Sequence, residues 1–209
     1  MNFGRSEFVH RENPIDCGRI VLFELFHFFL ILHFKKTGYH PIRHAVSDYG
    51  VGATKNLFLI YAWFSNLGAL SLSIVLLNIK DRFSISASIP ILIILMVISR
   101  ILMLFFPTDL EGEKLTVQGK LHYLFAILAF AFSYMVIDRG GSHLKLLEGF
   151  KNLNQFFNIV TIVSSISLGA VIVTMFKPLR FIFGICERVF LLTINIWFIV
   201  VSIWFVYIL

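Results

Sequence analysis

The chain alternates between long apolar runs and short polar stretches. An α-helix needs roughly 20 apolar residues to cross a hydrocarbon layer of about 30 Å, and five runs reach that length. A shorter run lies between Arg19 and the pair Lys35 and Lys36, whose side chains can extend outward and lengthen its reach. The pattern predicts an all-α, polytopic membrane protein, a bundle of six transmembrane helices. The predicted spans are residues 20–34, 57–78, 83–106, 119–138, 156–176 and 181–209.

The polar residues before the first run predict an N-terminal tail at residues 1–19, and no small-residue cleavage pattern of a signal peptide follows. No stretch rich in proline, glycine or serine divides the remaining sequence, and no internal repeat relates the first three spans to the last three. Residues 20–209 are therefore expected to form a single transmembrane domain. Small residues four apart predict close helix contacts in two spans. They are Ser65, Ala69 and Ser73 in one span, and Thr161, Ser165 and Gly169 in another.

Composition supports the membrane assignment: 58% of residues are hydrophobic, 14% are charged, 24 are phenylalanine, and the mean hydropathy is +0.85. These values exclude an ordinary soluble domain. The net charge of +6 comes from basic residues that stand singly or in pairs at the ends of apolar runs. That distribution is typical of interfacial anchors and not of a nucleic-acid-binding surface. We therefore expect membrane lipids as partners, no nucleic acid and no cofactor, while protein partners and oligomerisation stay open.

Charged residues inside the predicted spans gather toward one membrane face. Six spans place both termini on the same side, and basic residues are equally numerous on the two sides, so the positive-inside rule gives no orientation. Arg100 lies about 9 Å before the end of its span and Glu187 about 9 Å after the start of its own, both measured from the same face. His122 and Arg188 enter from that face too. The polar loops on this side add His40, His44, Ser47, Asp48 and Asp109.

Two interpretations of this cluster satisfy the rule that a charge in hydrocarbon, which costs about 2.5 to 3.5 kcal/mol, must find a partner. In the first, Arg100 pairs with Glu187 as a buried clamp. In the second, Arg100, His122 and Arg188 form the floor of a polar cavity that accepts an anionic group such as a lipid phosphate. Glu187 and Arg188 point about 100° apart on a helix and so cannot face each other. This leaves Arg188 as the stronger candidate for ligand binding.

An enzyme is the competing hypothesis, in the form of a membrane-embedded lipid hydrolase. His40 and His44 are four apart, and His122 would complete a zinc site. Pro41 allows the first two to share a helix only at its start, however, and nearby glycines indicate a loop, so we expect no metal. A serine-type alternative would use Ser47 with His44, oriented by Asp48 or Asp109. A purely structural or partner-binding membrane subunit is the third alternative.

Four segments at these same residues are the basis of a family resemblance. They are "GYHPIRHAVSDYG", "LFFPTD", "GKLHYLFAILAFA" and "GICERVFLLTINIWF". In their order and their placement among six spans they resemble the bacterial and archaeal membrane proteins grouped as domain of unknown function 998. The motif positions are His40, Pro41, Ser47, Asp48, residues 106–109, His122, Glu187 and Arg188.

The resemblance implies a six-helix protein of a cell membrane, the inner membrane in bacteria, with no established reaction. It also implies a distant relation to the eukaryotic Frag1, DRAM and Sfk1 membrane proteins. Its motif positions coincide with the charged cluster found by depth. We therefore expect an integral membrane protein that is not an enzyme and whose one-sided polar cluster binds a lipid headgroup or small anion.

Overall fold

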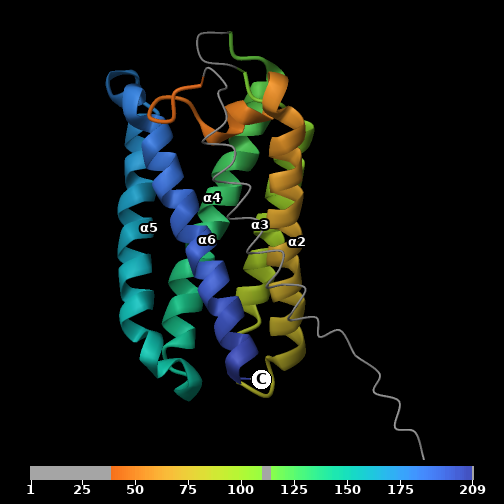
Figure 1. Cartoon of the computed structure of the whole chain (residues 1–209), viewed down its shortest axis with the longest axis vertical. Helices are drawn as coiled ribbons and strands as arrows, with labels where there is room; N and C mark the ends of the chain where they lie inside the picture. The colour runs from red at the N-terminus through yellow and green to blue at the C-terminus, as the bar shows by residue number, and fades with distance from the viewer. Residues whose placement is uncertain (1–38, 110–113, 209) are drawn as a thin grey trace, which may run out of the picture.

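A computed structural model describes residues 39–109 and 114–208 of the chain (Figure 1). These residues fold into five long helices joined by turns and 3-10 segments. The helices are α2 (Lys55–Ile79), α3 (Ser88–Phe105), α4 (Val117–Leu144), α5 (Asn154–Thr174) and α6 (Phe183–Ile208). The 3-10 segments are η1 (Val46–Gly50), η2 (Gly52–Thr54), η3 (Glu148–Leu153) and η4 (Lys177–Ile182). The predicted tail at 1–19 and first span at 20–34 lie outside the described residues.

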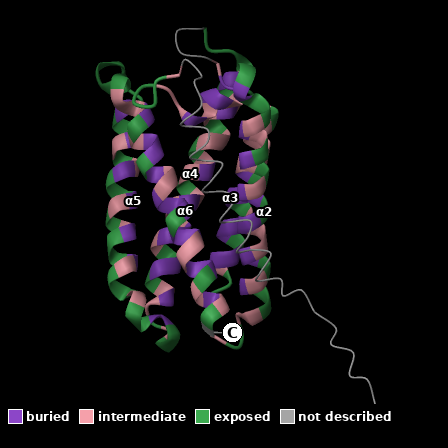
Figure 2. Ribbon diagram, in the orientation of Figure 1, coloured by how far each residue is buried: buried purple, intermediate pink, exposed green. Residues whose placement is uncertain are grey.

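All five helices are long and apolar enough to cross a membrane once the adjoining 3-10 segments are included. Their outward faces carry large apolar side chains that are exposed, among them Trp63, Leu67, Ile98, Ile127, Ile166 and Ile203 (Figure 2). A soluble protein rarely exposes apolar surface on this scale. The prediction of an all-α, multi-pass membrane protein is confirmed for the described part of the chain, with five spans in it.

Two helix boundaries differ from the predicted ones by more than two residues. Helix α3 begins at Ser88 and not at residue 83, because the chain first makes a turn in which Ser84 adopts a left-handed φ of 53°. Helix α4 continues past residue 138 to Leu144, through two consecutive glycines. A Cβ atom on Gly140 would lie 2.9 Å from the ring of Trp197 in α6. The glycine is therefore needed for close packing of α4 on α6, although in the sequence alone the glycine pair indicates a loop.

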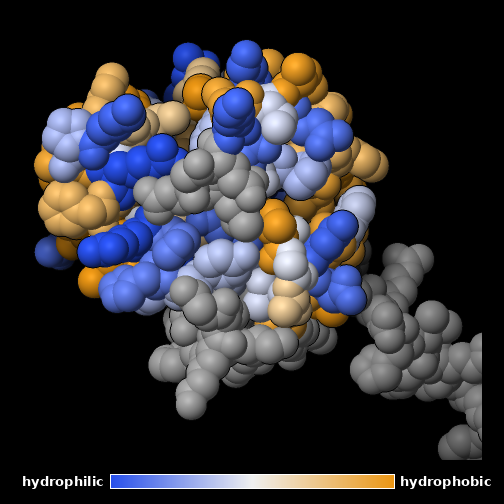
Figure 3. Space-filling view, turned by 90° about the horizontal axis from the view of Figure 1, so that it is seen from above, coloured by the Kyte–Doolittle hydropathy of each residue, from blue (hydrophilic) through white to orange (hydrophobic). Residues whose placement is uncertain are grey.

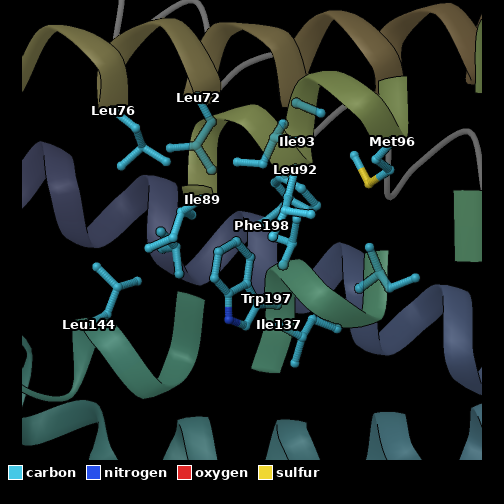
Figure 4. Packing of buried hydrophobic residues seen from close by; sticks show 14 of the residues in the cluster. Leu72, Leu76, Ile89, Leu92, Ile93, Met96, Ile137, Leu144, Trp197 and Phe198 are labelled. Atoms are coloured by element: carbon cyan, nitrogen blue, oxygen red, sulfur yellow. The ribbon is translucent and has the colours of Figure 1, made fainter. Parts of the chain in front are cut away.

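Successive helices run antiparallel, so that one end of the bundle carries the 39–54 segment, residues 106–109 and 114–116, and η4 (Figure 1). Helix α3 packs extensively on α2 and α4, and α5 packs on α6, whereas α4 and α6 contact each other only sparingly. The main apolar core lies largely toward the opposite end. There Trp197 and Phe198 pack among Leu76, Ile89, Ile137 and Leu144 (Figure 4). The polar end is thus less tightly filled than the apolar end.

The small residues predicted to form helix contacts behave differently in the two helices. Ser65, Ala69 and Ser73 are buried in α2, as predicted. In α5 the prediction holds only in part. The Ser165 hydroxyl lies 3.1 Å from the Tyr134 hydroxyl of α4, but the buried face carries Val160, Ser164, Ser167 and Val171. Ser165 and Gly169 are exposed, and a Cβ atom on Gly169 would have no atom within 4 Å.

Candidate functional site

The 39–54 segment folds over the start of α6 and is held there by the helix itself. The backbone N–H of Val46 donates to Glu187 Oε2 at 2.6 Å, and the N–H of Ile185 donates to the carbonyl of Ile42 at 3.1 Å. Within the segment, Asp48 accepts from the N–H of Ala45 at 3.0 Å and so fixes the start of η1. Two carboxylates therefore organise this loop by accepting hydrogen bonds from its backbone.

Arg188 is the second anchor of the segment. Its Nη1 donates to the carbonyl of His44 at 2.7 Å and to that of Gly184 at 3.0 Å. Its Nη2 donates to the hydroxyl of Tyr49 at 3.3 Å, and the guanidinium lies 5.6 Å from the centre of the Tyr49 ring. Arg188 is 6% exposed and borders neither of the two cavities described below. The structure thus places it as a positioning residue, in contrast to the expectation that it would face a ligand.

Gly184 allows the segment to approach α6 this closely. A Cβ atom at this position would lie 2.7 Å from the carbonyl oxygen of Pro41 and closer still to that of His44. Both obstacles are backbone atoms, which cannot rotate away as a side chain would. In the sequence the glycine stands four residues before Arg188, which is the spacing of two residues on one helix face.

The clamp between Arg100 and Glu187 is not formed. No ion pair joins them within residues 39–109 and 114–208, and this interpretation is wrong for the structure. Arg100 donates from Nη1 to Ser65 Oγ at 3.1 Å. Glu187 instead interacts electrostatically with Arg188 and Asp48. Arg100 and Glu187 lie at similar depths along their helices, as predicted. The rotation of each helix, however, directs the two side chains toward different partners.

His122 and Asp109 tie residues 106–109 and 114–116 to the start of α4. His122 donates from Nδ1 to the carbonyl of Phe106 at 2.7 Å. Asp109 accepts from the backbone N–H and the hydroxyl of Thr116, at 2.7 and 2.9 Å, and Thr116 caps the helix by accepting from the N–H of Gly119 at 3.1 Å. A Cβ atom on Gly119 would overlap the Asp109 carboxylate. The "PTD" and "GKLH" segments are therefore one structural unit.

A large cavity of about 580 Å³ lies between α4, α5, the start of α6 and the 39–54 segment. We call it the large cavity. Its polar wall consists of Arg43, Ser47, Asp48, Thr108, Asp109, His122, Tyr123, Arg180 and Glu187. Its apolar wall consists mainly of Ala126, Ile127, Phe130, Ala131, Leu168, Val171, Ile172 and Met175. The loops around this end carry many hydrophilic residues (Figure 3).

Five of the predicted site residues border the large cavity: Ser47, Asp48, Asp109, His122 and Glu187. Sequence reasoning did not assign a role there to Arg43 or Arg180, although both basic residues stand in loops on the predicted face. It also missed the apolar wall from α5. Leu168 and Ile172 are ordinary residues of a transmembrane run, and no sequence signal distinguishes a cavity wall from a lipid-facing surface.

A second, small cavity of about 80 Å³ lies deeper, between α2, α3, α4 and α6. It is bordered by Ser65, Asn66 and Arg100 and shares a wall with the large cavity. The shared residues are Ser47, Ala126, His122, Phe130 and Glu187. Arg100 thus borders a different space from the one that the cavity hypothesis assigned to it.

The hydrolase alternatives find no support in the geometry. In the part of the chain that the structure describes, no group of three His, Cys, Asp or Glu residues is arranged to hold a metal ion, so His40, His44 and His122 do not form a zinc site. The Nδ1 of His44 accepts from the N–H of His40 at 2.8 Å. No hydrogen bond joins Ser47 to His44 among the described residues, so the nucleophile and base of the serine-type alternative are not paired.

Comparison with known proteins gives one match. The family model described as "Protein of unknown function (DUF998)" matches residues 20–204. No curated protein and no solved structure is significantly similar to the chain. The match covers the 39–54 segment and the Glu187–Arg188 pair, so the residues that border the cavities lie within the family region.

Proposed function

The chain belongs to the DUF998 family, whose function is unknown, and from the geometry of this member we propose that it binds a membrane lipid with an anionic headgroup. The large cavity carries this proposal. Its volume of about 580 Å³ falls within the range of about 300 to 1,000 Å³ that is usual for ligand sites. One of its walls is polar and the other apolar, which matches the polar headgroup and the apolar acyl chains of a lipid.

The polar wall supplies two cations for a phosphate. Arg43 from the 39–54 segment and Arg180 from η4 both border the large cavity. Guanidinium groups bind phosphate oxygens through charge-assisted, often bidentate hydrogen bonds. Ser47, Thr108 and Tyr123 add hydroxyl groups that can donate to further headgroup oxygens. The headgroup is therefore assigned to the loop end of the cavity.

The apolar wall suits an acyl chain and lies where a lipid could enter. Ile127 of α4 and Ile172 of α5 border the large cavity, and each is 54% exposed. The two residues come from neighbouring helices, so an entry between α4 and α5 is part of the proposal. A lipid could thus pass from the bilayer into the cavity while its headgroup stays at the polar end. That the protein resides in the cell membrane, the inner membrane in bacteria, stays a prediction.

Native mass spectrometry of the protein in detergent, with phosphate-headgroup lipids added, tests the proposal. We expect the Arg43→Gln and Arg180→Gln double variant to bind these lipids at least about tenfold more weakly, a loss of about 1.4 kcal/mol or more. Leu168→Trp should reduce binding too, because the larger ring fills the apolar part of the cavity. Lys177→Gln removes a positive charge from an exposed residue of the same segment, η4, that does not border the large cavity, and it should bind as the wild type does.

Equal lipid retention by the wild type and both cavity variants would refute lipid binding at this site. Such a result would favour the structural or partner-binding subunit. If a sterol-like or uncharged lipid were retained in place of the phosphate lipids, the apolar wall would still be a lipid-binding surface. The role of the two arginines as phosphate ligands would be refuted.

A further inference from the structure

The small cavity is lined mainly by apolar side chains, but several polar side chains inside the bundle also border it. Ser65 and Asn66 of α2 and Arg100 of α3 border it, facing Glu187 of α6. Its volume of about 80 Å³ exceeds the roughly 30 Å³ that one water molecule occupies in the liquid. Polar side chains that border such a space among transmembrane helices need hydrogen-bond partners.

Asn66 indicates where such an occupant would lie. Its side chain is 3% exposed, and neither its Nδ2 nor its Oδ1 has a hydrogen-bond partner among the described residues. Leaving a buried amide unpaired costs about 1 to 3 kcal/mol, so native proteins rarely tolerate it. The amide borders the small cavity, and its N–H groups are therefore available to a bound group there.

Arg100 points to the charge of that group. A guanidinium carries five N–H donors, and within the described residues the hydrogen-bond partner of Arg100 is Ser65. It forms no ion pair in that part of the chain. A cation in a transmembrane helix requires a counter-charge nearby, and Arg100 and Asn66 present N–H donors to the same space.

We propose that the small cavity binds an inorganic anion of halide size, held by Arg100 and Asn66. Ser65, which accepts from Arg100, can turn its own hydroxyl hydrogen toward the anion. The proposal concerns a site separate from the large cavity and does not depend on lipid binding.

Glu187 is the rival source of counter-charge, because it borders the same cavity. Its Oε2 accepts from the N–H of Val46, and it forms part of the wall toward the large cavity. If waters linked this carboxylate to Arg100, the cation would be neutralised without an anion. The two arrangements predict opposite results for an added negative charge at Asn66.

The test measures the thermal unfolding midpoint of the full chain in detergent while gluconate is replaced by chloride or bromide at constant ionic strength. We expect the unfolding midpoint to rise with halide concentration until the site is saturated. The rise should be about 2 to 4 °C for each kcal/mol by which halide binding stabilises the folded state. Asn66→Leu should remove this rise. Asn78→Leu, an exposed asparagine of the same helix, should keep it. A wild-type midpoint that does not respond to halide would overturn the proposal.

Asn66→Asp decides the question even if the leucine variant fails to fold. It supplies a carboxylate of the same size beside Arg100, so it should raise the midpoint in gluconate and abolish the halide response. If Glu187 already neutralises Arg100, the new charge would be uncompensated and the midpoint would fall, which contradicts the proposal. In crystals soaked with bromide, an anomalous peak beside Arg100 should appear for the wild type and be absent for Asn66→Asp.

Discussion

Replacing Gly184 with alanine is expected to destabilise the protein and to release the 39–54 segment from α6. The added Cβ would lie 2.7 Å from the carbonyl oxygen of Pro41 and still closer to that of His44. Because these are backbone atoms, either the segment or the start of α6 must move. Overpacking of this kind costs about 1 to 3 kcal/mol. Thermal unfolding in detergent should show the loss, and limited proteolysis should cleave the segment faster.

Gly169→Ala is the matched control, because it is also a glycine-to-alanine change in a helix. No atom lies within 4 Å of a Cβ at that position. The higher helix propensity of alanine should therefore raise stability, by up to about 1 kcal/mol. Opposite signs for the two variants are expected. If Gly184→Ala unfolds at the wild-type temperature and resists protease equally, the close approach of the segment to α6 is wrong.

The fold was predictable wherever one physical rule decided it. Apolar run length located α2, α3, α4, α5 and α6, because the bilayer thickness sets the helix length. The rule failed at Gly140, where two glycines continue α4 because Trp197 packs against them. The small-residue rule held only in part on α5, where Ser165 contacts Tyr134 of α4 but Gly169 is exposed. Both errors concern which helix faces meet, and that depends on tertiary packing rather than on local sequence.

The sequence predicted how deep the site residues lie along their helices, but not the direction in which their side chains point. The helix rise of 1.5 Å per residue correctly placed Glu187 and His122 at the end of the bundle that carries Asp48 and Asp109. Partner choice depends on helix rotation and on how the 39–54 segment folds back. Glu187 therefore binds the backbone of Val46 instead of Arg100. Arg188, expected to meet a ligand, binds the carbonyl of His44.

Arg188→Met is expected to have the largest effect of all, about 3 kcal/mol or more in unfolding free energy. Hydrogen bonds from a charged group contribute about 1.5 to 3 kcal/mol each, and Arg188 makes one to His44 and one to Tyr49. Its loss also removes a nearby positive charge that stabilises the buried Glu187 carboxylate. Arg139→Met, an exposed arginine on α4, should change stability by less than about 0.5 kcal/mol.

A double variant separates the positioning role of Arg188 from a role in ligand binding. Gly184→Ala and Arg188→Met both disrupt the docking of the 39–54 segment, so their effects on the unfolding free energy should be less than additive, as for residues that share partners. Full additivity would mean that Arg188 stabilises something other than this segment. Lipid binding provides a further check. Arg188→Met should weaken lipid binding only because the displaced segment moves Arg43 and Ser47 away from the large cavity. A cross-link that fixes the segment to α6 should therefore return lipid binding to the wild-type level without Arg188, which a ligand-contacting arginine would not allow.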